Sequence, residues 1–210
     1  MVQPVMVQPL VHYSTIDQAG LVREPRHWRR GRASENISIV SVAIDPEAVG
    51  AVGVLAPDVC AAVASRAAAL IDIEALDRSG PGSAVPLWHT DGSEAWLNTW
   101  WQPRDSGFHD HGGSSGGVHV IAGEVTGEYL QIEGGRRMTR FGAGDSFSFT
   151  GDRIHRVDHL EGAVTVHVYS PPLSSIGHYE LVDGELRREA GAPDEVSPPS
   201  LELTRALGAA

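Results

Sequence analysis

The sequence contains no lysine and only one cysteine, Cys60. One cysteine cannot form an internal disulfide framework or a zinc site built from several thiolates. The sequence also lacks an apolar run of about 18 residues, which argues against a membrane-spanning helix. All 16 basic residues are arginine, and the 27 acidic residues outweigh them to give a formal net charge of −11. We therefore expect neither nucleic acid nor membrane as a partner.

The composition is that of an ordinary globular domain. The chain has 210 residues, of which 41% are hydrophobic and 20% charged, enough for one domain with a sizeable core. The N-terminus lacks the charged and apolar regions of a signal peptide, so we expect a cytoplasmic protein. The sequence shows neither a coiled-coil pattern nor an evident dimer face, so we also expect a monomer.

The pattern along the chain divides it into four segments. Residues 1–35 predict a weakly ordered arm, 36–87 a helical lead-in packed on the following domain, 88–190 a β domain and 191–210 a flexible tail. Within the lead-in, Pro57 and Asp58 favour a helix start, because proline fits the first turn and an acid suits its positive end. The predicted apolar stripe of this helix comprises Val59, Ala62, Val63, Ala69 and Leu70.

The β domain is predicted from short runs of period-two alternation separated by glycine-containing turns. The clearest runs are 95–101, 117–123, 127–133, 136–142, 145–151, 163–169 and 178–188. The last run contains Asp183-Gly184, a strong hairpin signal. Many short strands at even spacing predict an all-β sandwich or barrel.

Histidine is abundant, with ten copies, and seven of them lie between residues 89 and 167. His109 and His111 flank Asp110. On a strand the two imidazoles would share a face, while Asp110 would point the other way, to solvent or into a structural hydrogen bond. The glycine-rich stretch 112–117 follows directly. Further along, Gly144-Asp145 opens a run that leads to Gly151 and His155.

This order of histidines and glycines resembles the two motifs of the cupin superfamily. In cupins the first motif supplies two histidines and usually a glutamate, but Gly116 stands at the glutamate position here. Three neutral imidazoles would leave a divalent metal with a charge of about +2, which favours an anionic ligand such as a thiolate. Imidazole suits iron, zinc, copper and nickel alike, so the ligand type does not choose the metal.

Three blocks make the resemblance more specific: FHDHGGSSG at 108–116, IHRVDH at 154–159 and AVTVHVYSPPL at 163–173. Together they resemble the cysteine dioxygenase-type thiol dioxygenases. The resemblance implies a mainly β fold, a cupin (double-stranded β-helix or jelly-roll) barrel preceded by a few helices. It also implies an oxidoreductase of sulfur amino acid metabolism. Its metal-binding site would hold non-haem Fe(II) by His109, His111 and His155.

The resemblance further implies the reaction. A small thiol carboxylic acid, cysteine or an analogue such as mercaptopropionate, would bind the iron through its thiolate, and both atoms of O2 would go to sulfur to give a sulfinate. Thr165, His167 and Tyr169 match an outer-sphere relay of the family. They alternate on one predicted strand and so share a face, as a hydrogen-bonded chain requires.

Two departures from the family pattern matter. Some animal members link a cysteine covalently to the site tyrosine, but the matching position here is Gly116, so we predict no such cross-link. Family members also hold the substrate carboxylate with an arginine or glutamine, and the matching position falls near Trp88 or His89. A protonated His89 is one candidate partner for the carboxylate, although weaker than a guanidinium. Arginines from elsewhere are the others, namely Arg104, Arg153 or Arg156.

Other interpretations stay open. His159 is a candidate for bracing a metal ligand, and His119 for a structural role. A non-oxidative metal-dependent cupin, such as an isomerase or lyase, would hold zinc, nickel or manganese at the same histidines. A non-catalytic cupin that binds a small molecule as a sensor is the third possibility.

Overall fold

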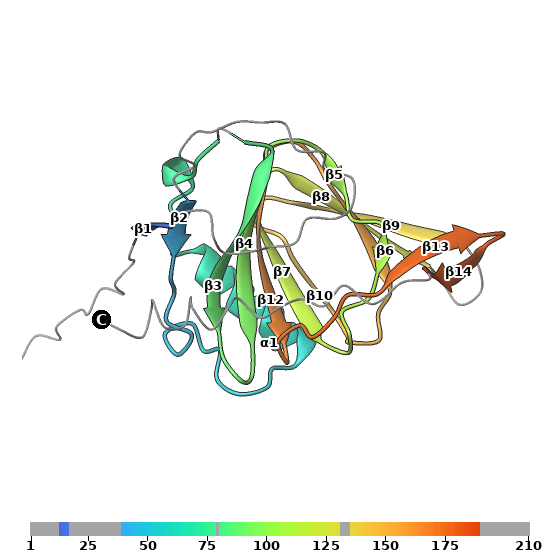
Figure 1. Cartoon of the computed structure of the whole chain (residues 1–210), viewed down its shortest axis with the longest axis horizontal. Coiled ribbons are helices and arrows are strands. Elements are labelled where there is room, and N and C mark those ends of the chain that lie inside the picture. The colour runs from blue at the N-terminus through green and yellow to red at the C-terminus, as the bar shows by residue number, and fades with distance from the viewer. Residues whose placement is uncertain (1–12, 17–38, 79, 131–134, 190–210) are drawn as a thin grey trace, which may run out of the picture.

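The computed structural model describes residues 13–16, 39–78, 80–130 and 135–189 (Figure 1). The tail predicted at 191–210 lies outside these residues. So does the predicted arm 1–35, apart from strand β1 (Tyr13–Ile16), which pairs antiparallel with β2 (Ile39–Val42).

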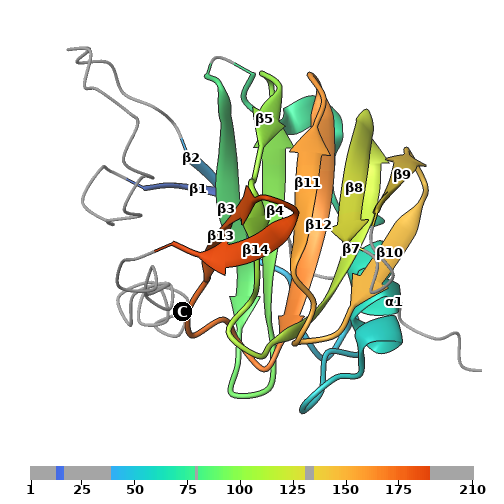
Figure 2. The ribbon, with the colours of Figure 1, turned by 90° about the vertical axis from the view of Figure 1, so that its right-hand side faces the viewer.

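Two larger antiparallel sheets form the body of the protein and face each other (Figure 2). The first has the order β10-β7-β12-β4-β3 and consists of β3 (Gly82–His89), β4 (Glu94–Trp100), β7 (Ser115–Ala122), β10 (Ser146–Phe149) and β12 (Ala163–Ser170). The second has the order β14-β13-β6-β11-β8-β9, with β5 beside β11. It consists of β5 (Arg104–Asp105), β6 (Phe108–His109), β8 (Glu124–Leu130), β9 (Arg136–Gly142), β11 (His155–His159), β13 (His178–Val182) and β14 (Glu185–Arg188). The fold is the mainly β barrel predicted from the sequence.

Strand β12 shows how the sequence places different chemistry on the two faces of the first sheet. Its valines, Val164, Val166 and Val168, are all buried and belong to the core beneath the helix. The alternate residues Thr165, His167 and Tyr169 point to the other face, between the two sheets. Period-two alternation therefore gives an apolar outer face and a polar inner face to one central strand.

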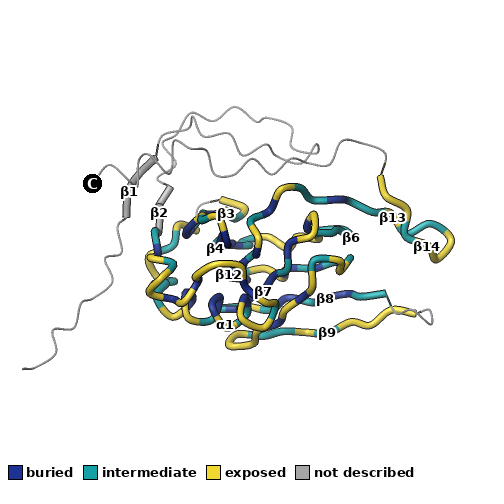
Figure 3. Tube along the Cα trace, turned by 90° about the horizontal axis from the view of Figure 1, so that it is seen from below, coloured by how far each residue is buried: buried dark blue, intermediate teal, exposed yellow. Residues whose placement is uncertain are grey.

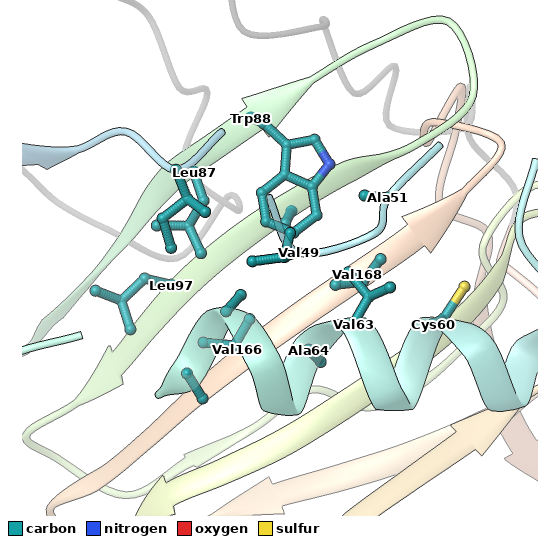
Figure 4. Close-up of a cluster of buried hydrophobic side chains, with 14 of the residues drawn as sticks. Val49, Ala51, Cys60, Val63, Ala64, Leu87, Trp88, Leu97, Val166 and Val168 are labelled. Atoms are coloured by element: carbon teal, nitrogen blue, oxygen red, sulfur yellow. The ribbon is translucent and has the colours of Figure 1, made fainter. Parts of the chain in front are cut away.

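Helix α1 (Pro57–Ala68) covers the outer face of the first sheet. Pro57 and Asp58 occupy its first turn, as predicted. The predicted stripe is wrong at Val59, Ala62 and Ala69, which are exposed, but Val63 is buried and Leu70 packs against the core. The buried face comprises Cys60, Val63, Ala64, Ala67 and Ala68 (Figure 4). Small residues fill it because the helix packs directly against the backbone of β7 at Gly117.

A second apolar cluster lies inside the barrel. It includes Val118, Val120, Phe147, Phe149 and Val157, contributed by both sheets. Figure 3 shows the buried segments gathered in β4, β7, β12 and α1, whereas β9 is largely exposed. The interior of the barrel therefore contains this apolar cluster and, beside it, polar side chains such as His167.

The boundaries differ in detail from the sequence prediction. Strand β3 begins at Gly82, within the segment predicted to be helical, since it pairs with β4 along its whole length. In the described part of 36–87 the only helices are α1 and a short 3-10 turn at Ile73–Ala75. Among the described helices, none has the length and apolar character needed to cross a bilayer.

The hairpin predicted at Asp183-Gly184 is confirmed. These two residues join β13 and β14, and both have positive φ, 52° and 86°. Positive φ at both central residues is the requirement of the two-residue turn that fits the twist of paired strands.

Candidate metal centre

Three histidines meet at the inner face of the second sheet. His109 ends β6, His111 follows in the next loop, and His155 begins β11 directly opposite His109. One ligand atom from each lies within 4.8 Å of the others, and the ring centroids are 4.8–5.1 Å apart. A small inward movement of the rings would bring one ion to the usual nitrogen–metal distance of about 2.1 Å.

The pairing of His109 and His111 has a different cause from the one predicted. Strand β6 stops at His109, so His111 does not share a strand face with it. A turn with positive φ at Gly112 and Gly113 follows instead. At Gly112 a β-carbon would lie 2.6 Å from the Ser175 hydroxyl, so the turn needs glycine for both its conformation and its space.

Asp110 holds this loop in place through structural hydrogen bonds. Its Oδ1 accepts from the backbone N–H groups of Gly112 at 2.9 Å and Gly177 at 3.2 Å. Its Oδ2 accepts from the Tyr179 hydroxyl at 2.6 Å. Asp110 therefore ties the loop between the two histidines to the β13–β14 hairpin, which extends beyond the barrel in Figure 1.

The protonation states suit metal binding. His111 and His155 are each 2% exposed, and burial together with the neighbouring imidazoles holds the pKa of each well below its usual value. Burial also lowers the pKa of His109. Because Nδ1 of His109 lies 3.0 Å from the Gly107 carbonyl, which can only accept, Nδ1 carries the proton and leaves the Nε2 lone pair free. The three histidines thus fit a divalent cation.

A cavity of about 150 Å³ opens in front of these histidines, between the two sheets. Its other lining residues are Asn98, Trp100, Ser106, Val118, Phe147, Phe149, Val157, His159, His167 and Tyr169. No carboxylate is among the lining residues. The cavity therefore offers aromatic walls, neutral polar groups and one candidate cation site.

The three residues predicted as a relay form a continuous hydrogen-bonded chain. Thr165 Oγ1 lies 2.9 Å from His167 Nε2, and His167 Nδ1 lies 3.1 Å from the Tyr169 hydroxyl. The Tyr169 ring stacks on His111 with centroids 5.3 Å apart, so the chain begins beside the candidate metal ligands. Burial lowers the pKa of His167 to about 3, which keeps its imidazole neutral, and raises the pKa of Tyr169.

The comparison with known families agrees with this geometry. Residues 86–181 match the model of the family described as cysteine dioxygenase type I. The barrel is therefore similar to the cysteine dioxygenase type over a little less than half of the chain. The match to this family supports an oxygenase-type enzyme. It begins within β3 and ends within β13, and it includes the three histidines and the Thr165–His167–Tyr169 chain.

Several solved structures match part of the chain, each with a TM-score below 0.5. KdgF from Halomonas sp. is 21% identical, with 48% of this chain and 90% of that one covered and a TM-score of 0.38. An HTH_3 family transcriptional regulator from Vibrio cholerae is 18% identical, with 44% and 52% covered and a TM-score of 0.35, so this chain spans about half of it. A Klebsiella pneumoniae protein with a double-stranded β-helix domain is 14% identical, with 58% and 97% covered and a TM-score of 0.40. None of the curated proteins compared with the chain matches it.

Gly116 stands where some animal members of the family have the cysteine that is linked to the site tyrosine, and the space beside it is filled. A β-carbon on Gly116 would lie 2.2 Å from a ring atom of Phe149. Phe149 in turn stacks on His111, with centroids 4.4 Å apart. The barrel thus has the Phe149 ring where a side chain at position 116 would stand. Cys60, the only cysteine in the sequence, lies on the buried face of α1, on the opposite side of the first sheet from Tyr169.

The candidate carboxylate partners are separated by the fold. His89 does not line the cavity; its Nδ1 lies 3.1 Å from the fully buried Glu94. The guanidinium of Arg153 stands over Tyr129, outside the cavity lining. Arg156 makes two hydrogen bonds to Asp105, at 2.8 and 2.6 Å.

Arg104 lies against a residue of the cavity wall. Its guanidinium stands 5.7 Å from the ring centre of the cavity residue Trp100, and its backbone pairs with His159. None of the four candidates lines the cavity, but the guanidinium of Arg104 stands over one of its walls.

Sequence reasoning did not single out Glu94, Asn98 or Phe149. The signal for the first two was present, because Glu94, Trp96, Asn98 and Trp100 alternate on β4 and face the inner side. Phe149 could not be found in this way, because its stacking on His111 depends on how the two sheets pack.

The buried histidines predict a loss of stability in mild acid. Burial lowers the pKa of His159 to about 4 and that of His167 to about 3, both from 6.5. As the pH falls from 6.5 towards 4, the unfolded chain takes up protons that the folded chain does not, so the free energy of unfolding falls. Urea unfolding midpoints at pH 7, 5.5 and 4.5 should decline in that order, and less steeply in a His159→Gln variant. A midpoint that stays constant over this range would contradict the burial of neutral imidazoles.

Proposed function

We propose that this protein is a non-haem Fe(II)-dependent thiol dioxygenase. It adds both atoms of O2 to the sulfur of a small thiol carboxylic acid, cysteine or an analogue such as mercaptopropionate, to give a sulfinate. The observation that carries the proposal is one cavity in which three neutral imidazoles, two of them buried, face a Tyr–His–Thr hydrogen-bonded chain. The family match supports it.

The ligand set favours an anionic substrate. Three neutral imidazoles do not offset the charge of a divalent ion, so a site of about +2 would stabilise a thiolate. When bound, the Fe(II) ion would supply that positive charge and the redox chemistry with dioxygen. The apolar part of the wall, Val118, Phe147 and Val157, would keep bulk water from the sulfur.

The direction of the relay follows from its donors. The indole N–H of Trp100 can only donate, and it lies 3.4 Å from Thr165 Oγ1. The Thr165 hydroxyl is then best satisfied by donating to His167 Nε2, so that His167 Nδ1–H donates to the Tyr169 oxygen. This arrangement leaves the Tyr169 proton free to point into the cavity, where it would hold the substrate or oxygen in position.

Replacing Tyr169 with phenylalanine should therefore retain iron and lower turnover. Loss of one preorganised donor in an active site typically lowers kcat about 100-fold. Iron content by elemental analysis and oxygen uptake with mercaptopropionate measure the two effects separately. Tyr129→Phe removes a hydroxyl outside the cavity lining and is the matched control. Unchanged kinetics of the Tyr169 variant would remove the role assigned to it.

Oxygen-electrode measurements on Fe(II)-loaded protein test the function itself. We expect oxygen uptake that depends on an added thiol, with a sulfinate product identified by mass spectrometry. The panel is cysteine, mercaptopropionate, mercaptosuccinate and cysteamine. Background uptake with all four would refute the proposal. Zinc, nickel or manganese in protein purified without added metal would then support the non-oxidative alternative.

A further inference from the structure

His159 is a cavity-lining residue that the proposed reaction has not used. It is 5% exposed and stacks on Trp100, with ring centroids 4.0 Å apart and an interplanar angle of 25°. Within the described part of the chain its ring nitrogens have no well-formed hydrogen bond, and their one polar contact is a weak one to the backbone of Arg104. A buried imidazole with unsatisfied nitrogens on a cavity wall is costly unless a ligand completes its hydrogen bonds.

The strand geometry places His159 and the metal ligand His155 on the same wall. His155, Val157 and His159 alternate along β11, and all three are buried and line the cavity. Four residues of strand separate the Cα atoms of the two histidines by about 13 Å. The wall therefore has the metal ligand at one end, an apolar middle and an imidazole at the other.

A carboxylate is favoured at the His159 end, because the negative charge of Asp105 there is offset by its hydrogen bonds from Arg156, whereas Arg104 stands over the cavity residue Trp100. Arg104 is paired with His159 in the β5–β11 register, and its guanidinium lies over Trp100. Near Tyr169 the nearby charge has the opposite sign, because the fully buried Glu94 is paired with Tyr169 in the β4–β12 register. A substrate carboxylate would be repelled by Glu94 and attracted by Arg104.

We propose that His159 recognises the carboxylate of the substrate, donating a ring N–H to one of its oxygens while Trp100 fixes the plane of the ring. This inference rests on the proposed function and specifies its substrate class. The substrate is a small thiol carboxylic acid whose sulfur lies at the three histidines and whose carboxylate lies between His159 and Arg104.

A pair of thiols with and without the carboxylate tests this assignment. His159→Phe keeps an aromatic ring against Trp100 and removes both nitrogens. We expect kcat/KM for 3-mercaptopropionate to fall about 10- to 100-fold, mainly through KM, as for loss of a hydrogen bond to a charged group. The value for propanethiol, which lacks the carboxylate, should stay within about twofold. His159→Gln, which restores an N–H donor, should recover part of the loss.

A binding measurement provides a readout that does not depend on turnover. Co(II)-loaded protein, titrated without oxygen and followed by its visible absorption, gives the dissociation constant of each thiol. We expect the His159→Phe change to weaken 3-mercaptopropionate and spare propanethiol. His119→Phe is the matched control, since His119 lies on the outer face of β7, where its Nδ1 is 2.8 Å from the Ser146 hydroxyl.

The outcomes separate the two proposals. If wild-type protein oxidises thiols but His159→Phe and His159→Gln weaken both thiols equally, or neither, the role of His159 is refuted and the function stands. If the wild type binds 3-mercaptopropionate through His159 without oxygen uptake, the function is refuted and the role of His159 stands. A wild type that binds neither thiol refutes both.

Discussion

The substitution His155→Ala is expected to give a folded protein that no longer retains iron. His155 is one of three candidate ligands and faces His109 directly across the β6–β11 pair. Loss of a group that merely orients a ligand typically costs 10- to 100-fold in metal affinity, and loss of the ligand itself costs more. Iron content should therefore fall from about one ion per chain to below about one tenth, and thiol-dependent oxygen uptake should fall to background.

Two further variants make this result interpretable. His155→Gln keeps most of the volume of the buried side chain and guards against an effect of the cavity that alanine leaves. His119→Ala removes a histidine that lies outside the cavity lining and should keep its iron. Circular dichroism verifies folding in each case. Full iron occupancy in the two His155 variants would refute a centre built on three histidines.

The second large effect is expected at Gly117, where helix α1 meets the first sheet. A β-carbon on Gly117 would lie 2.0 Å from the backbone nitrogen of Ala61. Helix backbone cannot rotate away as a side chain can, so Gly117→Val must push α1 off the sheet or distort β7. Overpacking of this kind costs about 3 kcal/mol at the upper end of its usual range. For a domain of this size, that corresponds to a melting temperature about 6–12 °C lower.

Thermal unfolding followed by circular dichroism measures this effect. Gly80→Val is the matched control, because a β-carbon on Gly80 meets nothing within 4 Å and its backbone needs no special conformation. Surface changes of that kind usually stay within about 0.5 kcal/mol of wild type. Equal melting temperatures for the two variants would show that α1 does not rest on Gly117.

The strands and the hairpin were predictable because their signals are local. Alternation in 163–169 determines both the strand and its two faces, and Asp183-Gly184 specifies a turn from two adjacent residues. The helix face was not predictable in the same way. The helix approaches the sheet at Gly117 with the backbone of Cys60 and Ala61, and this long-range contact sets the buried face, whereas the spacing of apolar residues alone placed the exposed Val59 on it.

The site shows the same division between local and long-range information. The motif predicted that His109, His111 and His155 would meet, and the structure brings them together. Their roles as ligands, and that of the relay, stay predictions. The sequence could not show that β5 places Arg104 beside β11 while His89 is held by Glu94, because both facts depend on which strands become neighbours.

Asp110 gives the fold a property that neither the loop nor the hairpin has alone. Asp110 makes hydrogen bonds with Gly177 and Tyr179, which lie 67 and 69 residues further along the chain. The same hydrogen bonds therefore hold the hairpin against the barrel and order the loop between His109 and His111. Such linkage is reciprocal: whatever free energy the docked hairpin contributes to binding a cation, the bound cation returns to docking the hairpin. Substitutions in the β13–β14 hairpin would thereby change the affinity for a cation at the three histidines without any change in the ligands themselves.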